Sequence, residues 1–227
     1  HLLIDELVTR KKDFKKTGIS VSKPKSISSQ PDGSIWYEAD TLPFYRKQLS
    51  QSQKAPHLNI TIGADHFACG LTFPNASFDK IYRKGIQRLV EKDMLQNELT
   101  HLLKGLTNNK FGNLHTVPYA YLLQQHFITQ KSQPKQDAQL RFDLRTLTGY
   151  KNKRINLNIK KNTRWVDMLQ EMILERNPSC HYQSGFGIMV TYTEKNKSFL
   201  NSPRDVTSFV IESWNALYPF AKTIVAR

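Results

Sequence analysis

The chain has 227 residues and carries 33 Lys and Arg against 19 Asp and Glu, which gives a formal net charge of +14. An apolar fraction of 39%, with 12 Phe, 9 Tyr and 3 Trp, excludes a disordered basic tail and is sufficient for a buried core. No run reaches the roughly 18 apolar residues of a membrane span, no secretory signal peptide is visible, and two cysteines are too few for a disulfide framework, so we expect an intracellular protein, cytoplasmic or nuclear.

The first predicted elements are a helix and two hairpins. The chain opens on His1 without a Met, so we expect a single basic domain over 1–227, excised from a larger protein. Apolar spacing predicts the helix, and the turns at Pro31-Asp32-Gly33 and at 63–66 predict the hairpins. In chain order these elements are a helix over 2–15, strands over 26–30 and 34–39, and strands over 57–62 and 67–73.

The middle of the chain predicts three helices and a linker. Helical spacing of apolar residues begins at Phe78 and continues in a second segment that ends near Leu106. Pro118 then opens a third helix that runs to about Ile128. Residues 132–139 are rich in Lys, Gln and Pro, which makes them the best candidate for an internal boundary.

The last third of the chain predicts a further hairpin and a long helix. Leu140–Leu147 and Ile155–Lys161 alternate as two strands, Asn162 or Thr163 caps a helix, 186–193 is a strand, and Ser202 caps the final helix. Strands thus come in adjacent pairs with short turns, and such pairs are antiparallel. The predicted fold class is α+β, a mostly antiparallel sheet built from hairpins with several packed helices.

One face of the predicted 140–161 hairpin is basic. Alternation directs Leu140, Phe142 and Leu144 to the core, so guanidinium, ammonium and amide groups occupy the other face and the loop. Arginine binds phosphate or guanine through two parallel hydrogen bonds, Asn pairs with adenine, and a two-stranded ribbon fits the major groove. The candidate nucleic-acid-binding residues are Arg141, Arg145, Lys151, Lys153, Arg154, Asn156, Asn158, Lys160, Lys161 and Arg164. The alternative is a solvated outer face in a Lys-rich protein.

Two aromatic residues of the predicted 34–39 strand are candidates for base stacking. Trp36 and Tyr37 are adjacent, so alternation directs them to opposite faces of the strand. An exposed ring beside basic residues is the platform on which single-stranded nucleic acids stack. The alternative is that both rings fill the core or an interface.

Catalytic motifs are weak. A metal-dependent nuclease needs converging carboxylates, and Glu38, Asp40 and Asp65 are the best candidates for that alternative. The chain has no phosphate-binding loop, dinucleotide fingerprint or nucleophile elbow. We therefore expect no catalytic residue and no cofactor.

Zinc ligation is equally weak in the sequence. His66 and Cys69 form one mixed pair, and Cys180 and His181 are adjacent. Structural zinc sites instead show two well-spaced ligand pairs, so we expect no metal site.

The charge excess is the strongest functional signal. It favours a polyanionic partner and salt-sensitive binding, and no basic amphipathic helix points to a membrane surface. The leading hypothesis is a non-catalytic nucleic-acid-binding module, DNA favoured over RNA, attached to the rest of its parent protein. By its plan alone the chain is compatible with specificity domains of restriction or other DNA-processing proteins. A protein-interaction domain that binds an acidic partner is the other alternative.

Overall fold

The computed structural model describes residues 2–10, 13, 28–29, 35–38, 56–74, 78–107, 111, 114–126, 135–145, 148–152 and 181–225. The strands are β1 (Ser28–Ser29), β2 (Ile35–Glu38), β3 (His57–Ile62), β4 (His66–Phe73), β5 (Thr116–His126), β6 (Lys135–Asp143), β7 (Thr148–Asn152) and β8 (His181–Thr191). The helical elements are α1 (Leu2–Thr9), η4 (Phe78–Arg83), α3 (Lys84–Glu91), α4 (Leu95–Thr107), η5 (Glu194–Asn196), α6 (Lys197–Leu200) and α7 (Pro203–Val225).

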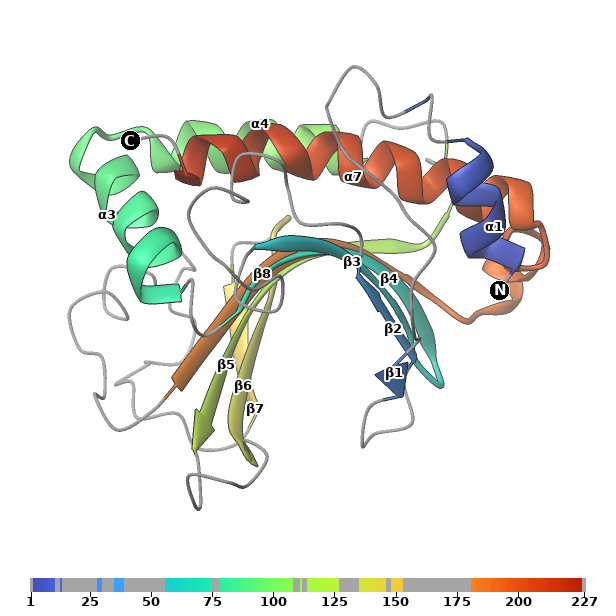
Figure 1. Ribbon diagram of the computed structural model, residues 1–227, viewed down its shortest axis with the longest axis horizontal. Coiled ribbons are helices and arrows are strands. Elements are labelled where there is room, and N and C mark those ends of the chain that lie inside the picture. The colour runs from blue at the N-terminus through green and yellow to red at the C-terminus, as the bar shows by residue number, and fades with distance from the viewer. Residues whose placement is uncertain are drawn as a thin grey trace.

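The strands form one sheet in the order β1-β2-β3-β4-β8-β5-β6-β7, and every pairing between them is antiparallel. The sheet is bent into an arch, and the long helices α4 and α7 run side by side over its convex side (Figure 1). Helix α3 lies at one end of this helical layer and α1 at the other (Figure 1). The fold is therefore α+β, as the sequence predicts.

Alternate residues of the central strands meet the helices. Phe67 of β4 contacts Phe209 of α7, and Phe186 of β8 contacts Phe220 with ring centroids 4.7 Å apart. We call this side the helix-covered face. It consists of Leu58 and Ile60 of β3, Phe67, Cys69, Leu71 and Phe73 of β4, Ala120 and Leu122 of β5, and Phe186, Ile188 and Val190 of β8, all of them buried.

Helix α7 confirms its sequence signals. Ser202 accepts a hydrogen bond from the backbone N–H of Asp205 through its hydroxyl, as an N-cap does, and Pro203 is the first helical residue. Trp214 is fully buried, and its indole N–H donates to the backbone carbonyl of Asn59 in the sheet. The long helix is thus fixed to the sheet by both apolar contact and a directed bond.

Several predicted elements are confirmed. The two N-terminal hairpins exist as β1–β2 and β3–β4, and the helices after Phe78 and up to Leu106 exist as η4–α3 and α4. The first helix is shorter than predicted, because α1 ends at Thr9. The strand predicted at 186–193 begins five residues earlier, at His181.

The helix predicted at 118–128 is wrong, since residues 118–126 belong to strand β5. Ala120 and Leu122 are buried on the helix-covered face, and β5 pairs along its length with β8 on one side and β6 on the other. A central strand buried on both faces has no clear alternation, so its apolar run also resembles a helix. Pairing on both sides decides the conformation here.

The hairpin predicted at 140–161 has a different second strand. Strand β7 is Thr148–Asn152, which the sequence interpretation assigned to the loop, and it pairs with β6 from Gln139 to Asp143. Residues 135–139 of the predicted linker also belong to β6. The strand predicted at 155–161 and the helix predicted after Asn162 lie outside the described residues.

Candidate binding face of the sheet

The side of the sheet opposite the helix-covered face carries polar and aromatic residues. It consists of His57, Asn59 and Thr61 of β3, Ala68, Gly70 and Thr72 of β4, Tyr119 and Tyr121 of β5, and Gln183, Gly185 and Gly187 of β8. We call it the polar face. Amide, hydroxyl and aromatic groups on neighbouring strands offer hydrogen bonds and ring surfaces together.

A chain of hydrogen bonds crosses the polar face. The amide Nδ2 of Asn59 donates to the Thr72 hydroxyl at 2.6 Å, and the hydroxyls of Thr72 and Tyr121 are 2.8 Å apart. Gln183 donates from Nε2 to the Tyr121 hydroxyl at 3.1 Å. Four side chains from four adjacent strands are therefore held in one network, which restricts the orientation of each.

Burial changes along this chain. Asn59 is 3% exposed and Thr72 1%, whereas Tyr121 and Gln183 are partly exposed. The buried end is joined to the helical layer, because Trp214 donates to the Asn59 carbonyl. A buried polar group must be hydrogen-bonded to avoid a cost of about 1–3 kcal/mol, and Asn59 and Thr72 satisfy this requirement through each other. Tyr121 and Gln183 form the partly exposed end of this chain of hydrogen bonds.

Glycines make room for the two tyrosines. A Cβ on Gly187 would meet the Cys69 carbonyl oxygen and lie 2.7 Å from the Tyr119 hydroxyl. A Cβ on Gly185 would lie 2.5 Å from the ring of Tyr121. No side chain fits in either place, so glycine in β8 is what allows the rings of β5 to lie against the sheet.

The sheet register places some of the predicted site residues on the polar face. Arg141 of β6 is opposite Tyr121 on one side and Tyr150 of β7 on the other. Trp36 of β2 is opposite Thr61. Because directly opposite residues share a face, positions 141, 150 and 36 continue the polar face across the sheet.

Two other predicted site residues fall at positions of the opposite face. Tyr37 is opposite Ile60, and Lys151 is opposite Leu140, which in turn is opposite buried Leu122. Lys153, Arg154, Asn156, Asn158, Lys160, Lys161 and Arg164 lie outside the described residues.

Arg145 follows β6 and is held by Asp143. Its Nε and Nη2 donate to the Asp143 carboxylate, the latter at 2.6 Å, and Nη1 donates to the Thr116 carbonyl. Partial burial alone would raise the pKa of Asp143, but the hydrogen bonds and charge of Arg145 outweigh it and keep this pKa below its usual range. The guanidinium has five N–H groups, so this arrangement leaves it able to bind a further anion.

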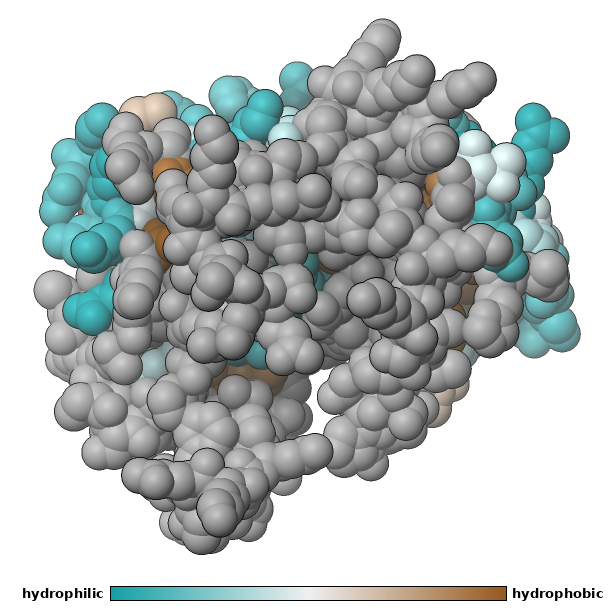
Figure 2. All heavy atoms as spheres, viewed as in Figure 1, coloured by the Kyte–Doolittle hydropathy of each residue, from teal (hydrophilic) through white to brown (hydrophobic). Residues whose placement is uncertain are grey.

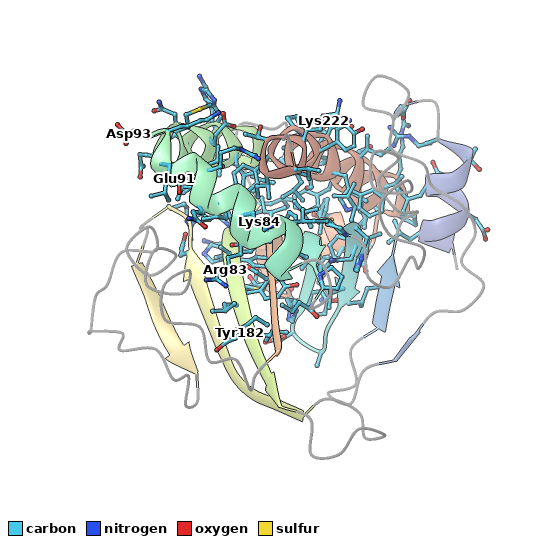
Figure 3. All side chains as sticks on the ribbon, turned by 60° about the vertical axis from the view of Figure 1, so that its left-hand side comes forward. Arg83, Lys84, Glu91, Asp93, Tyr182 and Lys222 are labelled. Atoms are coloured by element: carbon cyan, nitrogen blue, oxygen red, sulfur yellow. The ribbon has the colours of Figure 1, made fainter. Side chains whose placement is uncertain are left out.

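The described framework is almost neutral. Its residues contain 15 of the 33 Lys and Arg and 14 of the 19 Asp and Glu, a net charge of +1, whereas the remaining residues carry 18 cationic against 5 acidic side chains, a net charge of +13. On the helical layer, Arg83 and Lys84 lie at the start of α3 and Lys222 near the end of α7, with Glu91 and Asp93 at the far end of α3 (Figure 3). Figure 2 shows hydrophilic side chains at both ends of this layer. The helical layer therefore does not account for the charge excess.

Three basic segments are anchored at one end of the sheet. Residues 39–55 join β2 to β3, 127–134 join β5 to β6, and 153–180 join β7 to β8, and the register aligns all six strand ends at the same end of the sheet. Together these segments contain 10 Lys and Arg against 4 Asp and Glu. Gln183, the third residue of β8, lies near this end.

The carboxylates of the nuclease alternative are not brought together. Glu38 is opposite Asn59, whereas Asp65 lies in the turn beyond Ile62, so the two are separated by more than about 10 Å of strand. Asp40 lies outside the described residues. Among the residues that the structure describes, no group of three His, Cys, Asp or Glu is placed to hold a metal ion.

The residues considered for zinc are also apart. His66 is opposite Thr191, the last residue of β8, and His181 is the first residue of β8, so about 33 Å of strand separates these positions. Cys69 is buried on the helix-covered face; burial raises the pKa of its thiol, and a hydrogen bond with Ser213 offsets part of this. Cys180 lies outside the described residues.

Four residues of this face, Tyr119, Tyr121, Gln183 and Asn59, were not predicted from the sequence as members of one site. The signal available for the tyrosines was their spacing of two, which directs both to one face of a strand but not of a helix. Nothing in the sequence indicates that Asn59 and Gln183 lie near them, because β3 and β8 are separated by more than a hundred residues.

Comparison of the chain with protein-family models, with curated proteins and with solved structures finds no match. In the described part of the chain, no helix has the length and apolar character needed to cross a membrane. The site is therefore interpreted from its own geometry and charge.

Proposed function

We propose that this protein is a nucleic-acid-binding recognition module, DNA favoured over RNA, that performs no catalysis itself and belongs to a larger DNA-processing or restriction-type protein. The polar face of the arched sheet contacts the nucleic acid, and the basic side chains of the chain attract the phosphates. Arg141, at the position opposite Tyr121, contributes both charge and a planar hydrogen-bonding group.

The observation that carries this proposal is the polar face of a strongly basic chain. Arg141 of β6 lies at the register position opposite Tyr121, and the chain has a net charge of +14. The three segments anchored at one end of the sheet contain 10 Lys and Arg against 4 Asp and Glu. A cationic protein attracts polyanions and releases their counterions on binding.

The polar face supplies what charge alone does not. Tyr121, Gln183 and Arg141 at neighbouring register positions provide a ring surface for stacking and amide or guanidinium groups for base edges. Phosphate contacts give affinity, and base contacts give specificity. The two parts of the proposal therefore have different experimental signatures.

Binding to a short DNA duplex, followed by fluorescence anisotropy over a salt series, tests the proposal. The variant with Arg141, Arg145 and Arg154 all changed to Ala should bind about tenfold or more weakly at moderate salt and show a shallower salt dependence. The matched control changes Lys104, Lys197 and Arg204 of the helices to Ala, which removes the same charge elsewhere, and should bind within about twofold of the unchanged protein.

Equal weakening by both variants would show a non-specific charge effect and would reject the assigned face. Failure of the unchanged protein to bind DNA or RNA near physiological salt would reject the function. Binding to an acidic polypeptide in its place would then support the protein-interaction alternative.

A further inference from the structure

Gln183 stands at the partly exposed end of the hydrogen-bond chain on the polar face. It lies in β8 opposite Leu123 of β5, next to the row in which Tyr121, Arg141 and Tyr150 are aligned on three adjacent strands. An amide is thus placed beside an aromatic and cationic row on the face proposed to contact nucleic acid.

The amide of Gln183 is oriented by groups that are themselves fixed. Its Nε2 donates to the Tyr121 hydroxyl, which is bonded to Thr72, and Thr72 is bonded to Asn59. Thr72 and Asn59 are buried, and the indole of Trp214 holds the Asn59 backbone. A rotamer supported in this way is pre-organised, because little side-chain freedom remains to be lost when a ligand binds.

The remaining groups of this amide match one base. Gln183 uses one of its two Nε2 hydrogens on Tyr121, and among the described residues no contact occupies its Oε1. The amide oxygen of a glutamine and one of its N–H groups pair with the N6 donor and N7 acceptor of adenine in a bidentate arrangement. Guanine presents two acceptors at the corresponding edge, and pyrimidines present a single group.

We infer that Gln183 reads adenine in the bound nucleic acid and that Tyr121 is the positioning residue that orients it. This inference rests on the proposed function. Phosphate contacts alone would make binding insensitive to the nucleic-acid sequence, whereas a contact from Gln183 to adenine gives a base preference.

The test uses short single-stranded DNAs that differ only in a central run of A, C, G or T, and duplexes that differ only in a central run of A·T or G·C pairs. The unchanged protein should bind either the A-containing strand about tenfold more tightly than the other strands or the A·T duplex about tenfold more tightly than the G·C duplex. Gln183→Met, which keeps the length of the side chain and removes both hydrogen-bonding groups, should abolish this preference. The single-strand and duplex arms show whether the adenine is unpaired or paired.

Tyr121→Phe keeps the ring and removes the hydroxyl that orients Gln183. It should reduce the preference for A to about threefold, a change in the ratio of two affinities that a general loss of folded protein would not produce. Circular dichroism checks that both variants are folded. Gln87→Met is the matched control, because Gln87 is an exposed residue of α3 that bonds only Glu91 among the described contacts.

The outcomes separate the two proposals. If the unchanged protein binds DNA without a preference for A, or if Gln183→Met keeps the preference or weakens all DNAs equally, the reading role is overturned and the proposed function stands. If the unchanged protein binds none of the DNAs, the proposed function falls first and the reading role with it.

Discussion

The helix-covered face and the polar face share the same strands, because successive residues of β4 and β8 alternate between them. Cys69 and Leu71 face the helices, whereas Gly70 and Thr72 face the other way. On the helix-covered face most residues are apolar, and the aromatic ones meet rings of α7 and η4. On the polar face the buried residues are held by a directed hydrogen-bond chain.

This difference shows how one sheet serves stability and recognition at once. Apolar contact is non-directional and stabilises in proportion to the area removed from water, so it fixes the helices to the sheet without specifying a ligand. Hydrogen bonds are directional, and the net contribution of each to stability is only about 1 kcal/mol. The polar face therefore contributes orientation, and the helix-covered face contributes most of the free energy of unfolding.

The largest expected loss of stability comes from truncating a buried residue of the helix-covered face. Phe186 is fully buried between Tyr82 and Phe220, so Phe186→Ala should lower the free energy of unfolding by about 3–5 kcal/mol through lost transfer energy and a cavity. Denaturant titration measures the loss. Gln183→Ala, three residues away on the polar face, should cost less than about 1.5 kcal/mol. Similar losses for the two variants would contradict the division of roles between the faces.

An intermediate loss of stability is expected when a side chain is added at a glycine of the polar face. A Cβ on Gly187 would collide with the Cys69 backbone and the Tyr119 hydroxyl, so Gly187→Ala should destabilise by about 1–3 kcal/mol. In Gly105→Ala, the matched control on α4, the new Cβ lies 3.1 Å from that of Ala216 and helix propensity improves, so the change should stay below about 1 kcal/mol. Thermal unfolding of both variants compares them, and an unaffected Gly187→Ala would show that the sheet relaxes around the new methyl group.

The smallest effect concerns the ion pair at the rim of the polar face. Since Arg145 lowers the pKa of Asp143 in the folded protein, the pair contributes stability that is complete above the ordinary carboxyl pKa and is lost as pH falls through the lowered value. Asp143→Asn should therefore cost about 0.5 kcal/mol at pH 7, and the difference from the unchanged protein should shrink below about pH 4. Unfolding titrations over this pH range measure it. A difference that grows on acidification would have the wrong sign.

Alternation, turn residues and helix caps predicted the elements that depend on residues close to one another in the sequence. The β3–β4 hairpin was predicted from alternation and a turn, and α7 from Ser202, Pro203 and its apolar stripe. Alternation also predicted correctly that Leu140 and Phe142 lie at positions of one face and Arg141 at a position of the other. Strand β5 was not predicted, because Tyr119–Leu122 is apolar on both faces and such a run fits a helix as well as a strand. Its pairing with β6 and β8, which makes it a strand, is not visible in the local sequence.

The sequence by itself determined the α+β class, the two N-terminal hairpins and the excess of positive charge, because each depends on neighbouring residues or on composition. Only the tertiary structure decided that Asn59, Thr72, Tyr121 and Gln183 form one chain of hydrogen bonds. Thr72 is 49 positions from Tyr121, and Tyr121 is 62 from Gln183. Such contacts depend on strand order and register, which bring distant residues to one face and which no local pattern encodes.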